Sequence, residues 1–425
     1  MRLMLDSRNG KKRDITDKAG LLLLSLFLLA DSRFFYLCPL PSNLSGSASN
    51  KLLLGIFAII CVVGMSILGN KFKLGHYGFL IIGFYIILVI HMIVIKKTFD
   101  YNIKTIVAYY LPYIILIMYF TSIKLLEDKE NFIEFIKIIE IIIVILSIIL
   151  ITQLYIYNKY HRIFLNFTLS DWYTIYHIDA KGRFYSVAEG INRVAIPLAM
   201  YNFYIGSKSG KFYSLVALIM GLLNVVIVDQ SRVYFIQEVV AIIVMIIVVY
   251  GKKITLNKLL YSLIAITISI VVLWSKIKSI IITIIDYDGS AYARNDAIRY
   301  YLDIGKSYLL SGMGVAIPDK GSINYFLIKG PNGVYNYDDI GIFGVFASMG
   351  IIVVIWYLIV TVKNFLVSSK INDTYMKSLA YGLSSIMLTG LGTMSYLDSA
   401  RIISLLLTMV VIECGYILDK RGKFN

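Results

Sequence analysis

The chain has 425 residues, of which 58% are hydrophobic and only 16% are charged. A water-soluble protein of this length would carry more charge and less apolar surface, so the composition excludes an ordinary soluble fold. The 41 basic residues outnumber the 26 acidic ones and give a net charge of +15. That sign would suit nucleic acid, but the basic residues gather in short clusters between apolar segments, so we expect no nucleic-acid partner.

Apolar segments of roughly 18–25 residues recur along the whole chain, and each is long enough to cross a bilayer as a helix. Backbone polar groups find no water in lipid, and the sequence lacks the alternating pattern of a membrane barrel. We therefore expect an all-α integral membrane protein, a single polytopic domain over residues 1–425. About twelve transmembrane helices are expected, near residues 19–37, 51–69, 74–95, 103–123, 135–157, 187–206, 211–229, 232–250, 256–275, 340–362, 377–396 and 400–418.

Basic residues between apolar segments indicate the orientation, because they remain on the cytoplasmic side. They cluster before the first segment, after the last and in three connections: Arg8, Lys11, Lys12 and Arg13; Lys420, Arg421 and Lys423; Lys71 and Lys73; Lys252 and Lys253; Lys363 and Lys370. Both termini are then expected on the cytoplasmic side, and loops 158–186 and 276–339 on the outer side of the membrane. The connection with Lys96, Lys97 and Lys104 disagrees, because it falls on the outer side.

The loop 276–339 is the most informative segment of the chain. It is long, charged and rich in tyrosine, whereas almost every other connection is short. Because loops held by a rigid scaffold carry function, we expect the chemistry to take place there. Its candidate functional residues are Arg294, Arg299, Tyr301, Asp338 and Asp339.

Several familiar motifs are incomplete in this chain. The stretch 206–212 resembles a phosphate loop, but it has one intervening residue too few and ends in Phe212. The histidines and cysteines have no metal-ligand spacing. Asp286-Tyr287-Asp288 has the spacing that metal-dependent sugar transferases use, although a solvated turn explains it as well. We expect no metal and no cofactor.

Arginine suits phosphate, since its planar guanidinium makes bidentate contacts and keeps its charge. Arg294 has no acidic residue three or four positions away and shares a predicted helix face with apolar residues, so an anionic ligand would explain its charge. Arg299 has Asp296 and Asp303 at helical spacing, and a local ion pair is the alternative there. Arg193 has Glu189 four residues before it and Arg232 has Asp229 three before it, whereas Arg183 lacks a close acid apart from Asp179 in an irregular loop.

Four stretches, in this order, resemble the O-antigen polymerase and O-antigen ligase superfamily of membrane polysaccharide enzymes. They are Gly182-Arg183 with Glu189-Gly190-Ile191-Asn192, Gln230-Ser231-Arg232, Arg294 with Leu309-Leu310-Ser311-Gly312-Met313-Gly314, and Asp338-Asp339-Ile340-Gly341-Ile342-Phe343-Gly344 with Gly350. Ligase members have a histidine near the loop exit, where this chain has Asp338 and Asp339. That departure favours a polymerase.

The resemblance implies metal-independent glycosyl transfer between oligosaccharides carried on undecaprenyl diphosphate, in O-antigen and lipopolysaccharide or capsule biosynthesis. It implies that Arg232 and Arg294 stabilise the leaving diphosphate. Asp338 or Asp339 would accept the acceptor's proton, although either could simply cap the next helix. The implied substrate-binding residues are Arg183, Asn192, Arg193, Arg299 and Tyr301.

The implied partners are membrane lipid, a flippase and a chain-length regulator of the same pathway. The alternatives are an O-antigen ligase and a lipid-linked oligosaccharide flippase or transporter. Transporters commonly have two similar halves, whereas a single large loop makes this chain asymmetric, which favours an enzyme.

Two further features remain outside this interpretation. Glu238 lies inside an apolar segment, where an acid is functional or is paired with another helix. Asp398 and Arg401 flank a tight turn, and we expect them to pair with each other without a further role.

Overall fold

The computed structural model describes residues 2–32, 47–69, 72–162, 189–251, 289–317, 322–333, 335–399 and 401–422. Every regular element in these ranges is a helix, and they contain no strand. The helices are α1 (Arg2–Asp31), α2 (Ser47–Ile67), α3 (Gly78–Phe99), α4 (Ile103–Tyr110), η3 (Leu111–Ile117), α5 (Met118–Leu126), α6 (Lys129–Tyr160), α7 (Glu189–Ile205), α8 (Lys208–Leu223), η4 (Asn224–Asp229), α9 (Arg232–Tyr250), α12 (Gly289–Ser307), α13 (Ile323–Lys329), η5 (Tyr337–Asp339), α14 (Ile342–Ser369), α15 (Thr374–Thr389) and α16 (Ile402–Lys420).

Seven helical stretches of the described chain are long and apolar enough to cross a membrane: Gly78–Phe99, Ile103–Leu126, Lys129–Tyr160, Lys208–Asp229, Arg232–Tyr250, Ile342–Ser369 and Ile402–Lys420. They confirm a multi-pass, all-helical membrane protein. Four more predicted segments fall on α1, α2, α7 and α15, whose apolar stretches are shorter or less apolar. The predicted segment 256–275 lies outside the described residues, so the total of twelve stays a prediction.

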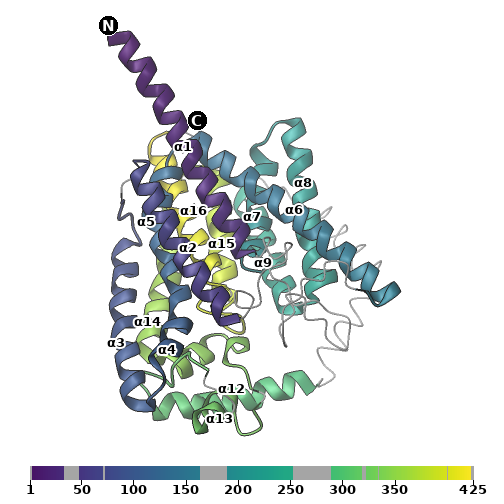
Figure 1. Cartoon of the computed structure of the whole chain (residues 1–425). Coiled ribbons are helices and arrows are strands. Elements are labelled where there is room, and N and C mark those ends of the chain that lie inside the picture. Colours follow the sequence, from purple (N-terminus) through teal and green to yellow (C-terminus); the bar gives the residue numbers. More distant parts are fainter. Residues whose placement is uncertain are drawn as a thin grey trace.

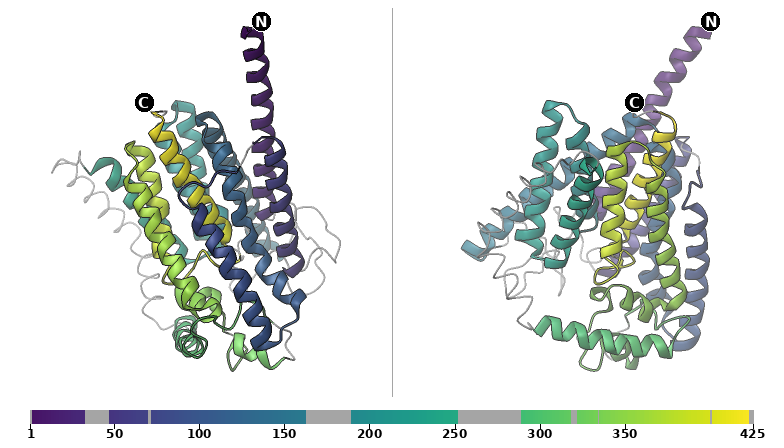
Figure 2. Two further views of the ribbon diagram at one scale, coloured as in Figure 1. Left: turned by 90° about the vertical axis from the view of Figure 1, so that its left-hand side faces the viewer. Right: turned by 180° about the vertical axis from the view of Figure 1, so that it is seen from behind.

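The helices form an elongated bundle with two distinct ends (Figure 1). Both chain termini lie at one end, called here the terminal end, as the basic clusters predict. Helices α12 and α13 lie at the opposite end, called here the loop end. Figure 2 shows the same arrangement from two further sides, with α12 running across the end of the bundle. The large polar loop and the termini are therefore separated by the length of the bundle.

The connection between α3 and α4 lies at the loop end, although it is basic. The Asn324 side chain, at the start of α13, donates a hydrogen bond of 3.0 Å to the Phe99 carbonyl. Lys96, in the last turn of α3, pairs with Asp100 of the connection at 2.6 Å. Sequence analysis placed these lysines on the outer side against the charge rule, and the structure places them with the large loop.

The stretch Ile103–Leu126 changes its helical geometry at Pro112. Proline lacks an N–H and crowds the preceding turn, so η3 continues as a tighter 3-10 helix before α5 begins. The Tyr85 hydroxyl donates one hydrogen bond that is shared between the carbonyls of Tyr113 and Ile114, at 3.3 and 3.1 Å. This geometry fixes Tyr113, which reappears in the candidate site.

Helix α14 is broken at Gly350, whose φ of 79° and ψ of 176° are not helical. The segment after α12 fills the break with its backbone. Three hydrogen bonds join the two: Met313 N to Ala347 O (2.8 Å), Gly314 N to Ser348 O (2.8 Å) and Ile351 N to Leu309 O (2.9 Å). Backbone groups inside a membrane protein need internal partners, so helix and loop satisfy each other. We call residues 309–314 the docked segment.

Two glycines allow this close approach. A Cβ atom at Gly350 would lie 2.2 Å from the Leu310 carbonyl oxygen, and one at Gly312 would lie 2.5 Å from the Ser348 carbonyl carbon. Both residues also have positive φ, which glycine adopts without strain. The Gly-x-Gly stretch of the sequence is therefore a packing requirement of the broken helix.

A histidine on α3 fastens the docked segment from the other side. His91 is only 4% exposed, and its Nε2 atom hydrogen-bonds the Ser311 carbonyl. Its Nδ1 atom lies 2.6 Å from the Tyr110 hydroxyl. The histidine therefore has partners on both ring nitrogens and serves to anchor the loop.

At the terminal end, three cations converge on one carboxylate. Glu127, between α5 and α6, is 6% exposed and pairs with Lys73 (2.6 Å), Arg421 (2.9 Å) and Lys124. Burial alone would raise the pKa of Glu127, but hydrogen bonds from Lys124 and Lys73 outweigh it and hold the pKa at about 2. We call these four residues the basic clasp; it joins α5, α16 and the segment before α3.

We expect Gly350→Ala to lower the free energy of unfolding by roughly 1–3 kcal/mol, because alanine is strained at this φ and its methyl group meets Leu310. Thermal unfolding in detergent measures the change. Gly83→Ala in α3 is the matched control, since a Cβ there meets nothing within 4 Å. Equal destabilisation by both variants would contradict the docking argument.

Glu127 also predicts a pH dependence. Its folded pKa lies below the ordinary value of 4.5, so its contribution is present above about pH 4.5 and is lost as pH falls toward 2. We expect Glu127→Gln to unfold at a lower temperature than wild type at pH 7, with a difference that shrinks at acid pH. Glu130→Gln, at an exposed site, serves as the control. A pH-independent difference would argue against an ionised clasp.

Candidate functional site

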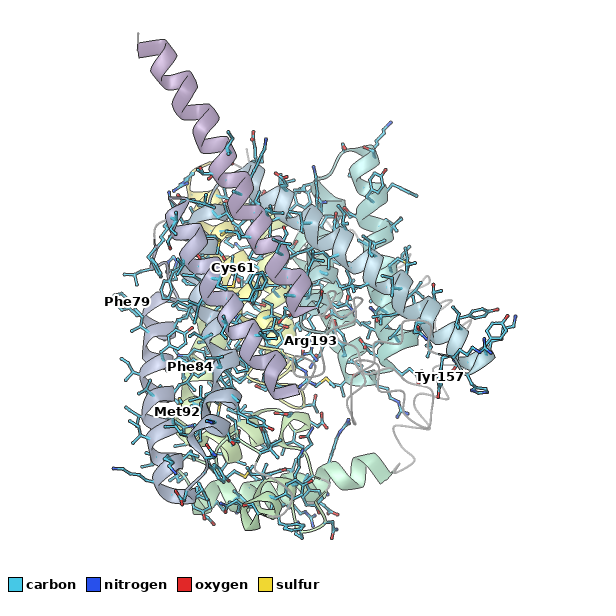
Figure 3. All side chains as sticks on the ribbon, in the orientation of Figure 1. Cys61, Phe79, Phe84, Met92, Tyr157 and Arg193 are labelled. Carbon is cyan, nitrogen blue, oxygen red and sulfur yellow. The ribbon has the colours of Figure 1, made fainter. Side chains whose placement is uncertain are left out.

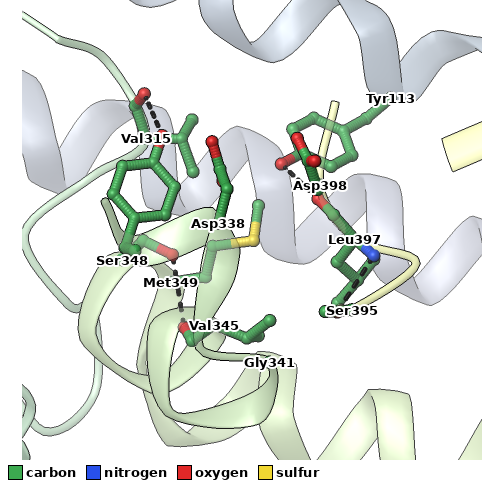
Figure 4. A pocket seen from close by; sticks show the side chains of 11 residues that line it. Tyr113, Val315, Asp338, Gly341, Val345, Ser348, Met349, Ser395, Leu397 and Asp398 are labelled. Atoms are coloured by element: carbon green, nitrogen blue, oxygen red, sulfur yellow. Dashed lines mark hydrogen bonds between the residues drawn. The ribbon is translucent and has the colours of Figure 1, made fainter. Parts of the chain in front are cut away.

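A small pocket lies at the loop end, beside the break in α14 (Figure 4). Four parts of the chain line it: η3, the segment that follows α12, the stretch from η5 into α14, and the turn between α15 and α16. The lining residues are Tyr113, Val315, Tyr337, Asp338, Gly341, Val345, Ser348, Met349, Ser395, Leu397 and Asp398. Its free space is about 10 Å³, close to the room that one water molecule needs.

Two carboxylates from distant segments meet at this pocket. Asp338 comes from the loop exit and Asp398 from the turn before α16. Arg401 joins the two segments: its Nη1 atom lies 2.8 Å from Asp398 Oδ2 and donates a 3.3 Å hydrogen bond to the Asp338 backbone carbonyl. The Asp398 and Arg401 side chains are only 9% and 7% exposed. Their predicted pairing is confirmed, but the meeting of Asp398 with Asp338 was not foreseen.

Neither Asp338 nor Asp339 caps α14. The N-cap residue is Gly341, and it makes no side-chain cap hydrogen bond. Asp339 instead accepts a 3.4 Å hydrogen bond from the Asn336 side chain. The capping alternative is therefore wrong, and both carboxylates are half-buried at the loop end.

Buried tyrosine hydroxyls brace the pocket walls. Tyr113 donates to the Leu397 carbonyl at 2.8 Å, and Tyr337 donates to the Val315 carbonyl at 2.9 Å. Burial, reinforced by the nearby charges of Asp338 and Asp398, raises the pKa of Tyr337 well above its usual range. Tyr337 therefore stays protonated and holds the loop backbone in place.

Lys329 is a cation near the carboxylates that sequence analysis missed. It ends α13, and its ammonium donates to the Asn336 side chain at 3.3 Å. Burial lowers the pKa of Lys329, while the negative charges of Asp338 and Asp339 oppose this shift. In the sequence, Lys329 simply follows an apolar run. It comes near Asp338 and Asp339 because the chain turns back after α13 toward η5.

The predicted arginines of α12 lie on the outside. Arg294 and Arg299 are both exposed, whereas Tyr301, which was expected on the same helix face as Arg294, is buried. Asp303 pairs with Lys306 at 3.1 Å, and no ion pair of Arg299 is present among the described residues. A local ion pair with Asp296 or Asp303 therefore does not explain the charge of Arg299.

The remaining predicted residues have different surroundings. Arg232 is exposed and begins α9, where the Ser231 hydroxyl caps the helix by accepting from Tyr234 N at 3.4 Å. Tyr301 is fully buried, and its hydroxyl donates to the Ile328 carbonyl at 2.5 Å, so it anchors α13. Arg183 lies outside the described residues.

Arg193 lies inside the bundle (Figure 3), and its neighbour in the chain, Asn192, is also fully buried. Arg193 is fully buried, and its Nη1 atom donates to Gln237 Oε1 at 3.1 Å. Its guanidinium lies 4.7 Å from the Tyr234 ring centre and 5.8 Å from that of Tyr396. The buried side chain of Asn192 donates a hydrogen bond to the Gly221 carbonyl at 3.4 Å.

Glu238 adds a buried acid to this cluster. It is fully buried on α9, and within the described part of the chain neither carboxylate oxygen accepts a hydrogen bond. The positive charge of Arg193, from α7, interacts with it. Glu238 therefore faces a positive charge on another helix, and the choice between pairing and a functional role stays a prediction.

One short segment separates the buried cluster from the pocket. The turn between α15 and α16 directs Met394 and Tyr396 toward Arg193, while Ser395, Leu397 and Asp398 line the pocket. The turn thus contacts both the buried Arg193 and the carboxylate pocket. A displacement of the turn would change both.

Similarity to known proteins gives no independent guide to the chemistry. The chain matches no protein-family model, and no curated protein matches it in sequence. Within the described ranges, no group of three or more histidine, cysteine, aspartate and glutamate side chains is arranged to hold a metal ion. The molecule is a multi-pass, all-helical membrane protein with a two-carboxylate pocket at its loop end.

We expect Arg401→Gln to lower the free energy of unfolding by about 3–5 kcal/mol, because it leaves Asp398 as a buried charge without this partner. Adding Asp398→Asn should recover part of the loss, which a double-mutant cycle measures. Lys306→Gln, which breaks an exposed pair with Asp303, should cost less than about 1 kcal/mol. Strict additivity of the Arg401 and Asp398 variants would show that the pair is not coupled.

Proposed function

We propose that the protein is a membrane polysaccharide polymerase that joins undecaprenyl-diphosphate-linked oligosaccharide units by glycosyl transfer at its loop end. The observation that carries the proposal is the meeting of Asp338 and Asp398 at one pocket, with Arg401 bonded to both segments. Carboxylates at the edge of a membrane bundle suit chemistry on a substrate whose lipid stays in the membrane and whose sugar lies in water.

In the proposed reaction, a hydroxyl oxygen of the acceptor sugar bonds to the anomeric carbon of the donor. The bond from that carbon to the lipid diphosphate breaks, and its electron pair leaves with the diphosphate. The hydroxyl proton passes to a carboxylate acting as general base. We assign this role to Asp338, because its half-buried side chain lines the pocket from the large loop, on the side where the sugar is expected.

The diphosphate leaves as an anion, so cations near it lower the barrier. Arg232 and Arg294 are the proposed stabilising residues, and both are exposed. The pocket is too small to hold a sugar, so we propose that the acceptor reaches the half-buried Asp338 from the loop side. Asp339 and Lys329, next to it, would contact the sugar hydroxyls.

The orientation of the protein in the membrane is part of the same proposal. About twelve transmembrane helices, cytoplasmic termini and a periplasmic loop would direct the pocket to the outer face of a bacterial inner membrane. A flippase of the pathway would supply the lipid-linked units, and a chain-length regulator would act on the product, an O-antigen, capsule or exopolysaccharide.

One observation favours a second candidate, a flippase for lipid-linked oligosaccharides. Arg193 and Glu238 are charged residues buried between helices of the bundle, and such residues commonly mark a transport pathway. The carboxylate pocket is at the loop end, outside such a pathway, and for this reason we place the polymerase first.

We expect Asp338→Asn to reduce polymer formation at least about 100-fold, the effect of losing a general base, while the protein still inserts into the membrane. The measurement is the surface glycan pattern of a deletion strain that carries the variant. Asp303→Asn is the matched control, because this exposed aspartate is at the same end and pairs only with Lys306 among the described residues.

The deletion strain itself separates the candidates. If the protein is a polymerase, the deletion strain should carry surface glycan with only a single repeat unit. Accumulation of free lipid-linked polymer would instead indicate a ligase. Failure of lipid-linked units to reach the outer face would indicate a flippase, and either result would overturn the proposal.

A further inference from the structure

The basic clasp at the terminal end holds more positive charge than its carboxylate neutralises. Lys73, Lys124 and Arg421 surround Glu127, whose side chain is 8% exposed. The three cationic side chains are 34%, 38% and 43% exposed, so each keeps a face toward its surroundings. Two positive charges of the clasp therefore remain without a counter-charge inside it.

Other acidic residues on the same elements are used elsewhere. Asp128 caps α6 by accepting from Glu130 N at 3.0 Å. Asp419 accepts the backbone N–H groups of Asn372 and Asp373, at 2.9 and 2.8 Å. If the negative charge of Asp128 is added to that of Glu127, the net charge of the clasp is still positive.

The donors of the clasp are also incompletely used. An ammonium has three N–H donors, and Lys73 and Lys124 each direct one to Glu127. Arg421 directs Nη2 to the Glu127 carboxylate and Nη1 to the Glu127 carbonyl, at 2.9 and 3.3 Å. The remaining N–H groups can meet an anion that approaches from the exposed side.

The clasp lies where the bundle leaves the apolar part of the membrane. Phe72 and Leu74, on either side of Lys73, are 59% and 46% exposed, and the Lys73 N–H is fixed to the Phe120 carbonyl at 3.1 Å. The membrane-spanning stretch that contains α5 ends at Leu126, and that of α16 ends at Lys420. A lysine between exposed apolar side chains is typical of the headgroup level of a bilayer.

We propose that the basic clasp is a binding site for the phosphate of an anionic phospholipid headgroup. The phosphate oxygens accept hydrogen bonds from Lys73 and Lys124, and the guanidinium of Arg421 provides a planar fork of donors. Phe72 and Leu74 contact the acyl chains just below. The site is independent of the chemistry proposed for the loop end, since it lies at the other end of the bundle.

The test uses the full-length protein in zwitterionic phosphatidylcholine nanodiscs, into which phosphatidylglycerol is titrated. Thermal unfolding and the number of bound phosphatidylglycerol molecules in native mass spectra are measured. We expect phosphatidylglycerol to raise the unfolding temperature of the wild type. Each lysine near a charged membrane contributes about fivefold in affinity, so Lys73→Gln/Lys124→Gln should weaken binding about 25-fold.

Two further variants separate lipid binding from a purely structural clasp. Glu127→Gln removes the competing carboxylate, so it should lower stability in phosphatidylcholine yet bind phosphatidylglycerol about fivefold more tightly. Lys96→Gln/Lys97→Gln removes two lysines at the loop end and should leave the lipid response unchanged. A structural clasp would lose stability in Glu127→Gln without any gain in lipid affinity.

The source of the phosphate is tested separately. Inorganic phosphate and glycerol phosphate, added at matched concentrations, should not shift the unfolding temperature. An equal shift by these soluble anions would overturn the assignment to lipid. An unchanged phosphatidylglycerol response in Lys73→Gln/Lys124→Gln would overturn the site itself.

Discussion

The structure depends on one constraint, the need of every backbone group in a membrane bundle for an internal hydrogen-bond partner. Helix α14 breaks at Gly350, and the docked segment supplies the missing partners. This exchange brings the polar loop into the bundle and fixes it against α3 through His91. The loop is thus part of the core, and the positions of Tyr337 and Asp338 follow from its docking.

The same constraint explains why the pocket has polar walls. The hydroxyl of Tyr337 satisfies the Val315 carbonyl just past the docked segment, while that of Tyr113 satisfies the Leu397 carbonyl in the turn before α16. Arg401 completes the set by bonding Asp398 and the Asp338 carbonyl. Each bond joins segments that are distant in sequence, so the carboxylates are held by the fold and not by their neighbours along the chain.

Sequence reasoning was reliable where a local pattern determines the outcome. Apolar length predicted a multi-pass helical protein, and the position of Asp398 and Arg401 on either side of a tight turn predicted their pair. It failed where tertiary contacts decide. The segment 340–362 read as an uninterrupted helix, because a single glycine in an apolar run does not reveal that another backbone will dock there. For Arg193 the sequence offered only Glu189 as a local partner, whereas its contacts with α9 and with the turn before α16, which bury it completely, are tertiary.

The position of α12 separates two groups of charges at the loop end. A Cβ atom at Gly305 would lie 2.3 Å from the Phe346 ring, so the C-terminal part of α12 packs tightly on α14, near Asp338. Its N-terminal part, with Arg294, extends beyond this contact (Figure 1). The proposed polymerase would have to hold a diphosphate and an acceptor hydroxyl at different points. Rigid attachment of α12 through Gly305 would keep the distance between its arginines and the carboxylates constant, which a fixed reaction geometry requires.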